Sequence, residues 1–186
     1  MYKDESLKKY LDDLAAKLPA PGGGSAAAMT AALGVSLISM VANFTVGKPK
    51  YAQYENEVRQ ILEKSEKLRL AFLELVDLDV KAYQSKNIGE ALDVPFRICR
   101  LTFEAMQLCP ALITKGNINL ISDVGVAAVF LESAFAAARL NVEINLRSIE
   151  DKGFVELTRK ELDEKEKSVK ELRKDTEVKV GKIIRG

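Results

Sequence analysis

The sequence predicts an all-α protein, a single domain over residues 1–186 that folds as a bundle of about six helices. Nearly every long segment repeats its apolar residues at a spacing of three or four, and no segment alternates in the manner of a strand. Two segments are apolar on all sides, as the central helices of a bundle are. The chain has 186 residues, 47% of them hydrophobic, which is typical of one globular domain with a sizeable core.

The first helix is expected over residues 7–18, because the segment Pro19–Gly24 cannot continue it. Ser25 is expected to cap the next helix, which lies in the uncharged stretch over Ala26–Val46. This stretch is long enough for a membrane span. Its many Ala, Gly, Ser and Thr residues, and its place behind an amphipathic helix, favour a central bundle helix over a membrane span or a signal peptide.

A long helix is expected next, over Tyr51–Lys86, after the break at Gly47–Pro49. Its residues at steps of three or four form one stripe, which should be buried. The stripe consists of Tyr51, Tyr54, Val58, Ile61, Ser65, Leu68, Phe72, Leu75, Asp79 and Ala82. Asp79 is therefore expected on the buried face of this helix, and Asp77 is not.

The following helix is expected to begin at Asp93, which can act as its N-cap and is followed by Pro95 in the first turn. Gly89 breaks the chain before it. The helix should kink or stop at Cys109–Pro110, and Gly116 should close this segment.

The last third of the chain contains the second central helix, expected over Val124–Leu146. A connector over 117–121 precedes it, and Ser122 and Asp123 provide an N-cap and a first-turn acid. A charged helix should follow over 154–182. Its apolar stripe repeats every seven residues, at Val155, Leu162, Val169, Thr176 and Ile183. So narrow a stripe places the helix on the outside of the bundle or against a partner chain.

The composition excludes several classes of function. Lys plus Arg is 28 and Asp plus Glu is 27, so the chain has no general basic field, which argues against nucleic acid as a partner. Histidine is absent, which excludes Ser-His-Asp and Cys-His catalysis and histidine metal sites. Proton transfer must then use Asp, Glu, Lys, Tyr, Cys or bound water. Cys99 and Cys109 are expected to be free buried thiols in a reducing cytoplasm, with no metal site.

Two motifs lie on the expected central helices. The first is the Gly-rich turn of Gly22, Gly23, Gly24 and Ser25. It offers backbone N–H groups to an anion at a helix N-terminus, although a tight turn between helices explains it equally well. The second motif is Asn141 and Asn145, one turn apart on one side of a helix. They can bridge helices, which is the commoner use of buried amides, or bind a polar heterocycle.

Two aspartates complete the candidates. An ionised carboxylate is costly to bury, so Asp79 is expected to pair with Arg97 or Arg100, to stay hydrated at a rim, or to bind a ligand. Asp123 is either a plain first-turn acid or part of a site. Eighteen residues separate it from Asn141, roughly 27 Å along a helix. The two belong either to opposite ends of one protomer or to a site that a second subunit completes.

The chain resembles the cyclodeaminase domain of the formiminotransferase-cyclodeaminase family in five phrases, which occur in the family's order over about Leu14–Ile149. The phrases are LPAPGGGSAAAMTAALG, VANFTVGKPKY, DLDVKAY, VPFRI and GNINLISDVGVAAVFLESAFAAARLNVEINL. The ordered set is far more specific than any single phrase. The resemblance implies an all-helical dimer that acts on one-carbon derivatives of tetrahydrofolate. The formiminotransferase domain to which some animal members are fused has no counterpart in this chain.

The resemblance implies a formimidoyltetrahydrofolate cyclodeaminase, which forms 5,10-methenyltetrahydrofolate and ammonia. The alternatives are a methenyltetrahydrofolate cyclohydrolase at the same site and a non-catalytic helical module that dimerises. Neither reaction needs a metal or a permanently bound cofactor, but both benefit from a carboxylate near the cationic carbon. The expected catalytic residues are Asp79 and Asp123. The expected substrate-binding residues are Gly22, Gly23, Gly24, Ser25, Lys48, Tyr51, Asn117, Ser122, Asn141 and Asn145.

A homodimer is expected on separate grounds. Two helices that are apolar on all sides occur in a chain with few other long helices to cover them. A second copy of the chain would bury their exposed apolar sides. The protein is expected in the cytoplasm.

Overall fold

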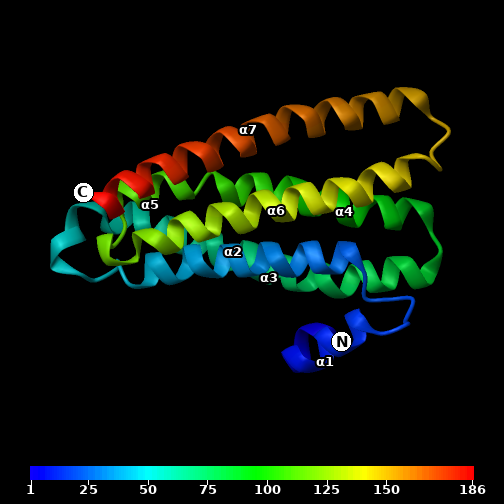
Figure 1. Ribbon diagram of the computed structural model, residues 1–186, viewed down its shortest axis with the longest axis horizontal. Helices are drawn as coiled ribbons and strands as arrows, with labels where there is room; N and C mark the ends of the chain where they lie inside the picture. Colours follow the sequence, from blue (N-terminus) through cyan, green and yellow to red (C-terminus); the bar gives the residue numbers. More distant parts are fainter.

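The computed structural model describes residues 1–186, all of which belong to one α-helical bundle (Figure 1). The long helices are α2 (Gly23–Asn43), α3 (Glu55–Ser85), α4 (Ile88–Met106), α6 (Ile121–Leu146) and α7 (Lys152–Arg185). Two shorter helices are α1 (Leu7–Ala15) and α5 (Cys109–Lys115), and three 3-10 turns span Tyr2–Asp4, Pro49–Tyr54 and Ile118–Leu120. The all-α prediction is confirmed, and the break at Cys109–Pro110 separates α4 from α5 as expected.

The two helices that the sequence makes apolar on all sides, α2 and α6, form the centre. α2 packs against α3 and α6, and α6 also contacts α4 and α7. Gly34 allows the two central helices to approach closely, because a Cβ there would lie 3.1 Å from Cγ of Leu131 and 3.2 Å from the carbonyl oxygen of Ala127.

Both central segments are also long and apolar enough to cross a membrane, judged by length and composition. In the most apolar stretch of 18 residues, 61% of the residues are buried for Gly23–Asn43 and 39% for Ile118–Leu146. α2 is therefore mostly core. α6, by contrast, keeps four large apolar side chains exposed, those of Val126, Val129, Leu140 and Ile144.

The start of α2 differs from expectation. Gly22 occupies the N-cap position, and Ser25 lies inside the first turn. The prediction that Ser25 caps the helix is wrong because Asp79 of α3 accepts the N–H of Ser25 at 2.8 Å and so satisfies a first-turn donor from outside the helix. The helix also ends at Asn43, and α1 ends at Ala15, both earlier than expected.

The start of α4 is also earlier than expected. The side chain of Asn87 caps it by accepting the N–H groups of Gly89 and Glu90, so Pro95 lies inside the helix. Asp93 is exposed and is 3.7 Å from Arg97. The prediction of an Asp93 cap is wrong because Asn87 offers the same chemistry one and a half turns earlier.

The remaining boundaries differ less. A 3-10 turn replaces the first residues of the helix expected at Tyr51, so α3 begins at Glu55. Ser122 lies in the first turn of α6 instead of capping it, while Asp123 is the first-turn acid that was expected. Gly116 ends α5, as predicted.

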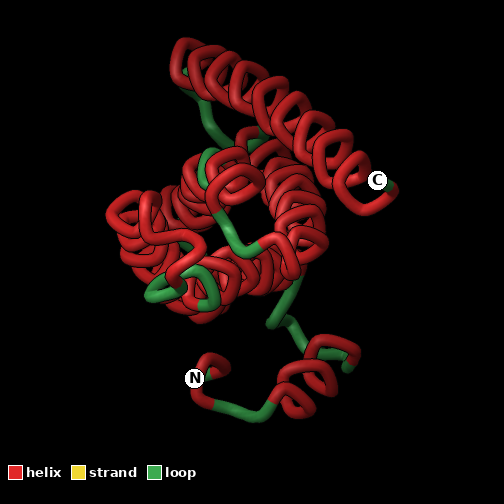
Figure 2. Tube along the Cα trace, turned by 90° about the vertical axis from the view of Figure 1, so that its left-hand side faces the viewer, coloured by secondary structure: helices red, strands yellow, loops and turns green.

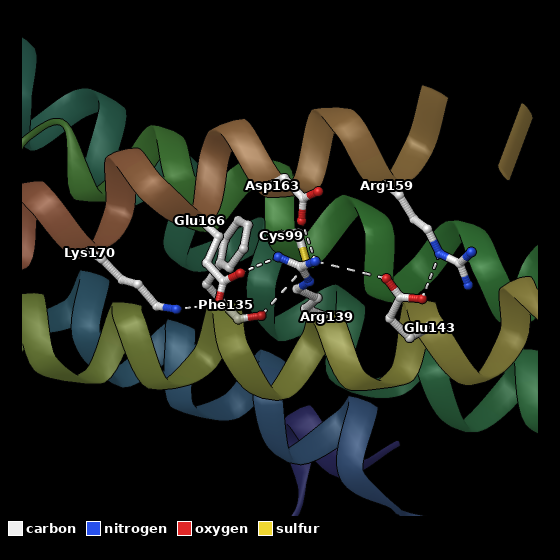
Figure 3. Close-up of polar contacts among 8 residues, drawn as sticks. All are labelled: Cys99, Phe135, Arg139, Glu143, Arg159, Asp163, Glu166 and Lys170. Carbon is white, nitrogen blue, oxygen red and sulfur yellow. Dashed lines mark hydrogen bonds and ion pairs between the residues drawn. The ribbon is translucent and has the colours of Figure 1, made fainter. Parts of the chain in front are cut away.

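α7 lies along the outside of the bundle against α6 and α4, the first of its two expected placements (Figure 1). Leu162, Val169 and Thr176 of its predicted stripe are buried, whereas Ile183 is 39% exposed. The side chain of Arg139 on α6 pairs with Glu166 and Asp163 of α7 (Figure 3).

These contacts with other helices replace most of the ion pairs expected within α7. Three pairs in α7 have the favourable spacing of four: Glu156–Lys160, Glu161–Lys165 and Asp163–Lys167. Of these, only Glu161–Lys165 forms, at 3.8 Å. Asp163 is used by Arg139 of α6, and Glu161 also binds Arg100 of α4 at 2.7 Å.

The N-terminal segment lies on the side of the bundle opposite α7 (Figure 2). The N–H of Tyr2 donates to Oδ1 of Asp77 at 2.7 Å, and Asp77 is only 2% exposed. The expectation that Asp77 points away from the buried face is wrong because the N-terminal residues cover that second face of α3.

Both cysteines are free and buried, as expected. Burial raises the pKa of the Cys99 and Cys109 thiols to about 12, so neither forms a reactive thiolate near neutral pH.

Candidate active site

A cavity of about 290 Å³ lies at the end of the bundle where α2 begins and α6 ends, the right-hand end in Figure 1. The end of α3 and the start of α4 complete its walls. Six of the residues singled out from the sequence line it: Gly22, Gly23, Gly24, Asp79, Asn141 and Asn145. Their convergence from three helices makes this cavity the candidate active site.

Asp79 is the acidic residue of the cavity. Its Oδ2 accepts the N–H of Ser25 at 2.8 Å. Burial raises the pKa of the Asp79 carboxyl, and the hydrogen bond from Ser25 offsets part of that rise. The pairing with Arg97 or Arg100, one of the three alternatives for Asp79, does not form: Arg97 is beside Asp93 and Arg100 binds Glu161. Asp79 therefore faces the cavity without a cation of the protein beside it.

Of the three glycines in the turn, Gly24 is the one that the packing requires. A Cβ at Gly24 would lie 2.0 Å from Oδ1 of Asp79, whereas a Cβ at Gly22 would have nothing within 4 Å. The close approach expected from the Gly-rich turn is thus made, in part, to the carboxylate of α3.

The N-terminus of α2 opens toward the cavity. No side chain caps this helix, and the N–H groups of Gly23 and Gly24 have no acceptor in the protein. Such unpaired donors and the positive end of the helix dipole attract an anionic or carbonyl oxygen.

Asn141 and Asn145 present amide groups from the last turns of α6. Nδ2 of Asn145 donates to the carbonyl oxygen of Ala91 at 2.5 Å and so bridges α6 to α4. Nδ2 of Asn141 donates to the carbonyl oxygen of Ala137 on its own helix at 2.9 Å. These bonds hold both side chains in place and leave both Oδ1 atoms as acceptors for a ligand in the cavity.

Five of the twelve candidate residues lie at the opposite end of the bundle. These residues are Lys48, Tyr51, Asn117, Ser122 and Asp123. Here the hydroxyl oxygen of Tyr51 accepts the N–H of Ile118 at 3.0 Å, and Nδ2 of Asn117 donates to the carbonyl oxygen of Phe44 at 3.1 Å. Within one chain these five residues do not reach the cavity.

Two tyrosines near the cavity were missed by sequence reasoning. Tyr83 lines it and follows Asp79 by one helical turn, so the spacing of four was an available signal. Tyr10 of α1 is 3% exposed, and its hydroxyl lies 3.2 Å from Oγ of Ser25. Nothing in the sequence indicates this contact, because a Gly-Pro segment that is not helical separates the two residues.

The arrangement suits a polar heterocycle that carries positive charge. An unpaired, half-buried carboxylate stabilises a cation, amide oxygens accept N–H groups, and helix N–H groups donate to a carbonyl. The carboxyl with a raised pKa can also move a proton.

Comparisons with known proteins agree with this chemistry. A family model described as formiminotransferase-cyclodeaminase matches residues 6–87 and 84–164. A methenyltetrahydrofolate cyclohydrolase of Methylorubrum extorquens is 38% identical, over 88% of this chain and 89% of that protein. A formimidoyltransferase-cyclodeaminase of Rattus norvegicus is 29% identical over 84% of this chain, but the match spans only 33% of the rat protein.

The fold has a counterpart among solved structures. The crystal structure of a formiminotetrahydrofolate cyclodeaminase from Thermotoga maritima is similar with a TM-score of 0.85 and 30% sequence identity. The match covers 100% of this chain and 98% of that one.

Proposed function

The chain belongs to the formiminotransferase-cyclodeaminase family, and from this premise we propose that it is an enzyme acting on a one-carbon derivative of tetrahydrofolate in the cavity between α2, α3 and α6. The observation that carries the proposal is Asp79, a half-buried carboxylate that faces the cavity without a cation of the protein. Both reactions named for the relatives pass through a cationic carbon, for which such a carboxylate is suited.

The first candidate reaction is cyclodeamination. The 10-nitrogen of the folate attacks the protonated formimino carbon on the 5-nitrogen, and a tetrahedral intermediate forms. A base takes the proton from the 10-nitrogen, and the amino group receives a proton and leaves as ammonia. The positive charge remains on the methenyl bridge, so charge and protons balance.

The second candidate reaction is hydrolysis of the same methenyl bridge by water. The 38% identity to a methenyltetrahydrofolate cyclohydrolase, over nearly the full length of both chains, favours it. The two reactions share the cationic carbon, so the same carboxylate serves either.

We assign the residues of the cavity by their chemistry. Asp79 lies beside the cationic carbon and stabilises it. The Oδ1 atoms of Asn141 and Asn145 accept N–H groups of the pterin, and the N–H groups of Gly23 and Gly24 donate to its carbonyl oxygen. The substrate's cationic charge offsets the cost of keeping Asp79 ionised in a half-buried position.

The proposal is tested by the absorbance of the methenyl bridge, measured with formimino- and methenyltetrahydrofolate in separate assays. Growth of the absorbance from the formimino substrate supports the deaminase. Decay of the absorbance faster than in buffer supports the cyclohydrolase. If neither the growth nor the faster decay occurs, the proposal is contradicted. Because it includes no metal, EDTA is expected to leave the rate unchanged.

We also propose that the protein is a cytoplasmic homodimer. The apolar side chains of Val126, Val129, Leu140 and Ile144 on α6 are exposed, and a second copy would cover them. Light scattering at micromolar concentration should give twice the mass of one 20.5 kDa chain. A monomeric mass would contradict the dimer but leave the enzymatic proposal standing.

A further inference from the structure

The N-terminal arm, residues 1–20, supplies none of the groups that act on the substrate, yet it reaches the candidate active site. The arm consists of the 3-10 turn Tyr2–Asp4, α1, and a linker over residues 16–20 that leads toward α2. Pro19 and Ala20 of this linker line the cavity together with the Gly-rich turn. The arm therefore forms part of the cavity wall.

Two hydrogen bonds attach the arm to the helices that position Asp79. The hydroxyl group of Tyr10 lies 3.2 Å from Oγ of Ser25 on α2, and the N–H of Ser25 in turn donates to Asp79. The N–H of Tyr2 donates to Oδ1 of Asp77 at 2.7 Å, two residues before Asp79 on α3. The docked arm thus contacts the same two helices that the Asp79 carboxylate joins.

Few buried contacts hold the arm in place. Tyr10 is the one buried residue of the arm, whereas Leu7, Leu11 and Leu18 are exposed at 66%, 52% and 50%. No other helix packs along the length of α1, which lies beside the bundle (Figure 1). Segments with so few buried apolar contacts open locally at a small cost in free energy.

Docking of the arm also carries a cost. Asp77 is 2% exposed, and its Oδ2 has no hydrogen-bond partner, so a carboxylate oxygen is buried without compensation. Water would reach this oxygen if the arm detached. The ion pair between Lys3 of the arm and Glu74 of α3 lies at the surface, where such pairs contribute little. Docking is therefore a balance in which the ring of Tyr10 is the main favourable contact.

We infer that the arm is a detachable wall of the active site, which docks through Tyr10 and whose docking is coupled to folate binding. The inference deepens the proposed function and rests on it. Tyr10 is a positioning residue, because it touches Ser25 and not the cavity. A folate that contacts Pro19 and Ala20 binds best to the docked chain, so its apparent dissociation constant is the intrinsic constant divided by the docked fraction.

Tyr10→Ala tests the coupling through steady-state kinetics. Loss of the buried ring should raise KM at least about tenfold and leave kcat within about twofold of the wild-type value, because saturating folate restores docking. Tyr10→Phe keeps the ring and loses only the bond to Ser25, so it should recover most of the affinity. An unchanged KM, or a fall in kcat alone as partial unfolding would cause, would overturn the inference.

Leu7→Ala is the matched control on the same helix. Leu7 is 66% exposed, so its removal should leave docking, KM and kcat as in the wild-type protein. If Leu7→Ala raised KM as much as Tyr10→Ala does, the effect would belong to α1 in general, and the role of Tyr10 would be lost.

Hydrogen exchange in α1 tests docking without turnover. An isolated helix of nine residues is marginal in water, so the backbone of a detached arm exchanges rapidly. The probe is 5-formyltetrahydrofolate, which carries a one-carbon group on the 5-nitrogen but has no amino group to expel. Saturation with this probe should slow exchange in α1 of the wild-type protein at least about tenfold. Without the probe, Tyr10→Ala should speed exchange in α1 and leave α6 unchanged.

The two measurements separate this inference from the proposed function. Turnover of either folate with the wild-type KM in Tyr10→Ala would overturn the detachable wall and leave the enzyme standing. Exchange in α1 that does not change although calorimetry shows the probe bound would overturn it as well. If the wild-type protein turned over neither folate, the proposed function would fail, and the exchange of α1 in the ligand-free proteins would still judge docking through Tyr10.

Discussion

Asp79 has one hydrogen bond from the protein, the N–H of Ser25, and no cation beside it. A carboxylate held for a structural ion pair would leave a stranded charge when removed, at a cost of about 3–5 kcal/mol. Asp79 has no such partner. We therefore expect Asp79→Asn to leave the melting temperature unchanged or raised while turnover falls by roughly 10²–10⁴.

Calorimetry and the methenyl absorbance assay measure the two effects on the same preparation. Early melting with an unchanged rate per folded molecule would identify Asp79 as a structural residue.

The pH dependence of this substitution follows from the direction of the shift. Burial raises the pKa of Asp79 in the folded state above the ordinary aspartate value of 3.8, so the folded protein binds a proton that the unfolded chain has already released. Ionised Asp79 thus lowers stability as pH rises through this window. The stability advantage of Asp79→Asn should be greatest above the raised pKa and vanish below about 3.8. Thermal melts of the wild-type protein and of Asp79→Asn at several pH values check this prediction. A difference in melting temperature that does not change with pH would contradict it.

Gly24 supports Asp79 through the absence of a side chain. A Cβ would fall 2.0 Å from Oδ1 and 2.7 Å from Cγ of that carboxylate, both far inside contact distance. We expect Gly24→Ala to push Asp79 away from the N–H of Ser25, to destabilise the fold by about 1–3 kcal/mol and to lower turnover sharply. Gly22→Ala is the control, because a Cβ there meets nothing within 4 Å, and it should behave as wild type. Equal rates for the two variants would sink this role of Gly24.

The difference between residues that sequence reasoning found and those it missed is one of sequence distance. Asp79 interrupts an otherwise apolar stripe within one helix, and the two asparagines share one helical side, so local spacing suffices to select them. Tyr10 and Asp77 acquire their places from the N-terminal segment, which folds back onto α2 and α3. No local pattern encodes where a segment beyond a Gly-Pro turn will dock.

At the scale of helices, apolar periodicity predicts which segments are helical but not which residue caps each one. Ser25 and Asp93 are good caps by type, yet Asp79 and Asn87 perform those roles. A side chain from another helix, or an equally good cap earlier in the chain, wins because it satisfies the same N–H groups. Helix type was therefore predictable, and helix starts depended on packing.

The contact between α6 and α7 depends on a partly buried arginine. Arg139, with 22% of its side chain exposed, pairs with Glu166 and Asp163 of α7 (Figure 3). Arg139→Met should leave Asp163 without a partner and Glu166 with only the exposed Lys170, destabilise the fold by about 1–3 kcal/mol and speed hydrogen exchange in α7.

The control for Arg139 is a second cation on the same acid. Lys170 pairs with Glu166 at 2.8 Å but is 58% exposed, so Lys170→Met should change stability by less than about 1 kcal/mol. A larger effect of the lysine than of the arginine substitution would contradict this view of the interface.

At the scale of the whole molecule, the sequence predicts a bundle with two central helices but cannot say which of their faces stays open. α6 is apolar on all sides. Only the packed structure shows that α2, α4 and α7 cover three of its sides and leave exposed the side on which Ser133 lies. The stripe of α7 is compatible both with a place on the outside of the bundle and with a partner chain. In the structure, α7 packs on the outside of its own bundle. The surface proposed to bind a second copy is therefore the exposed apolar side of α6.

The open face predicts how the assembled molecule responds to a single charge. Leu140 of α6 and Leu157 of α7 are equally exposed in one chain, at 72% and 71%. In the proposed dimer the partner covers Leu140, and a carboxylate buried there without a counter-ion costs several kcal/mol. Leu140→Glu should therefore give a monomer by light scattering, with helicity retained. Leu157→Glu should remain dimeric and active, since α7 lies away from the proposed interface. The reverse pattern, a monomer from Leu157→Glu alone, would move the interface to α7.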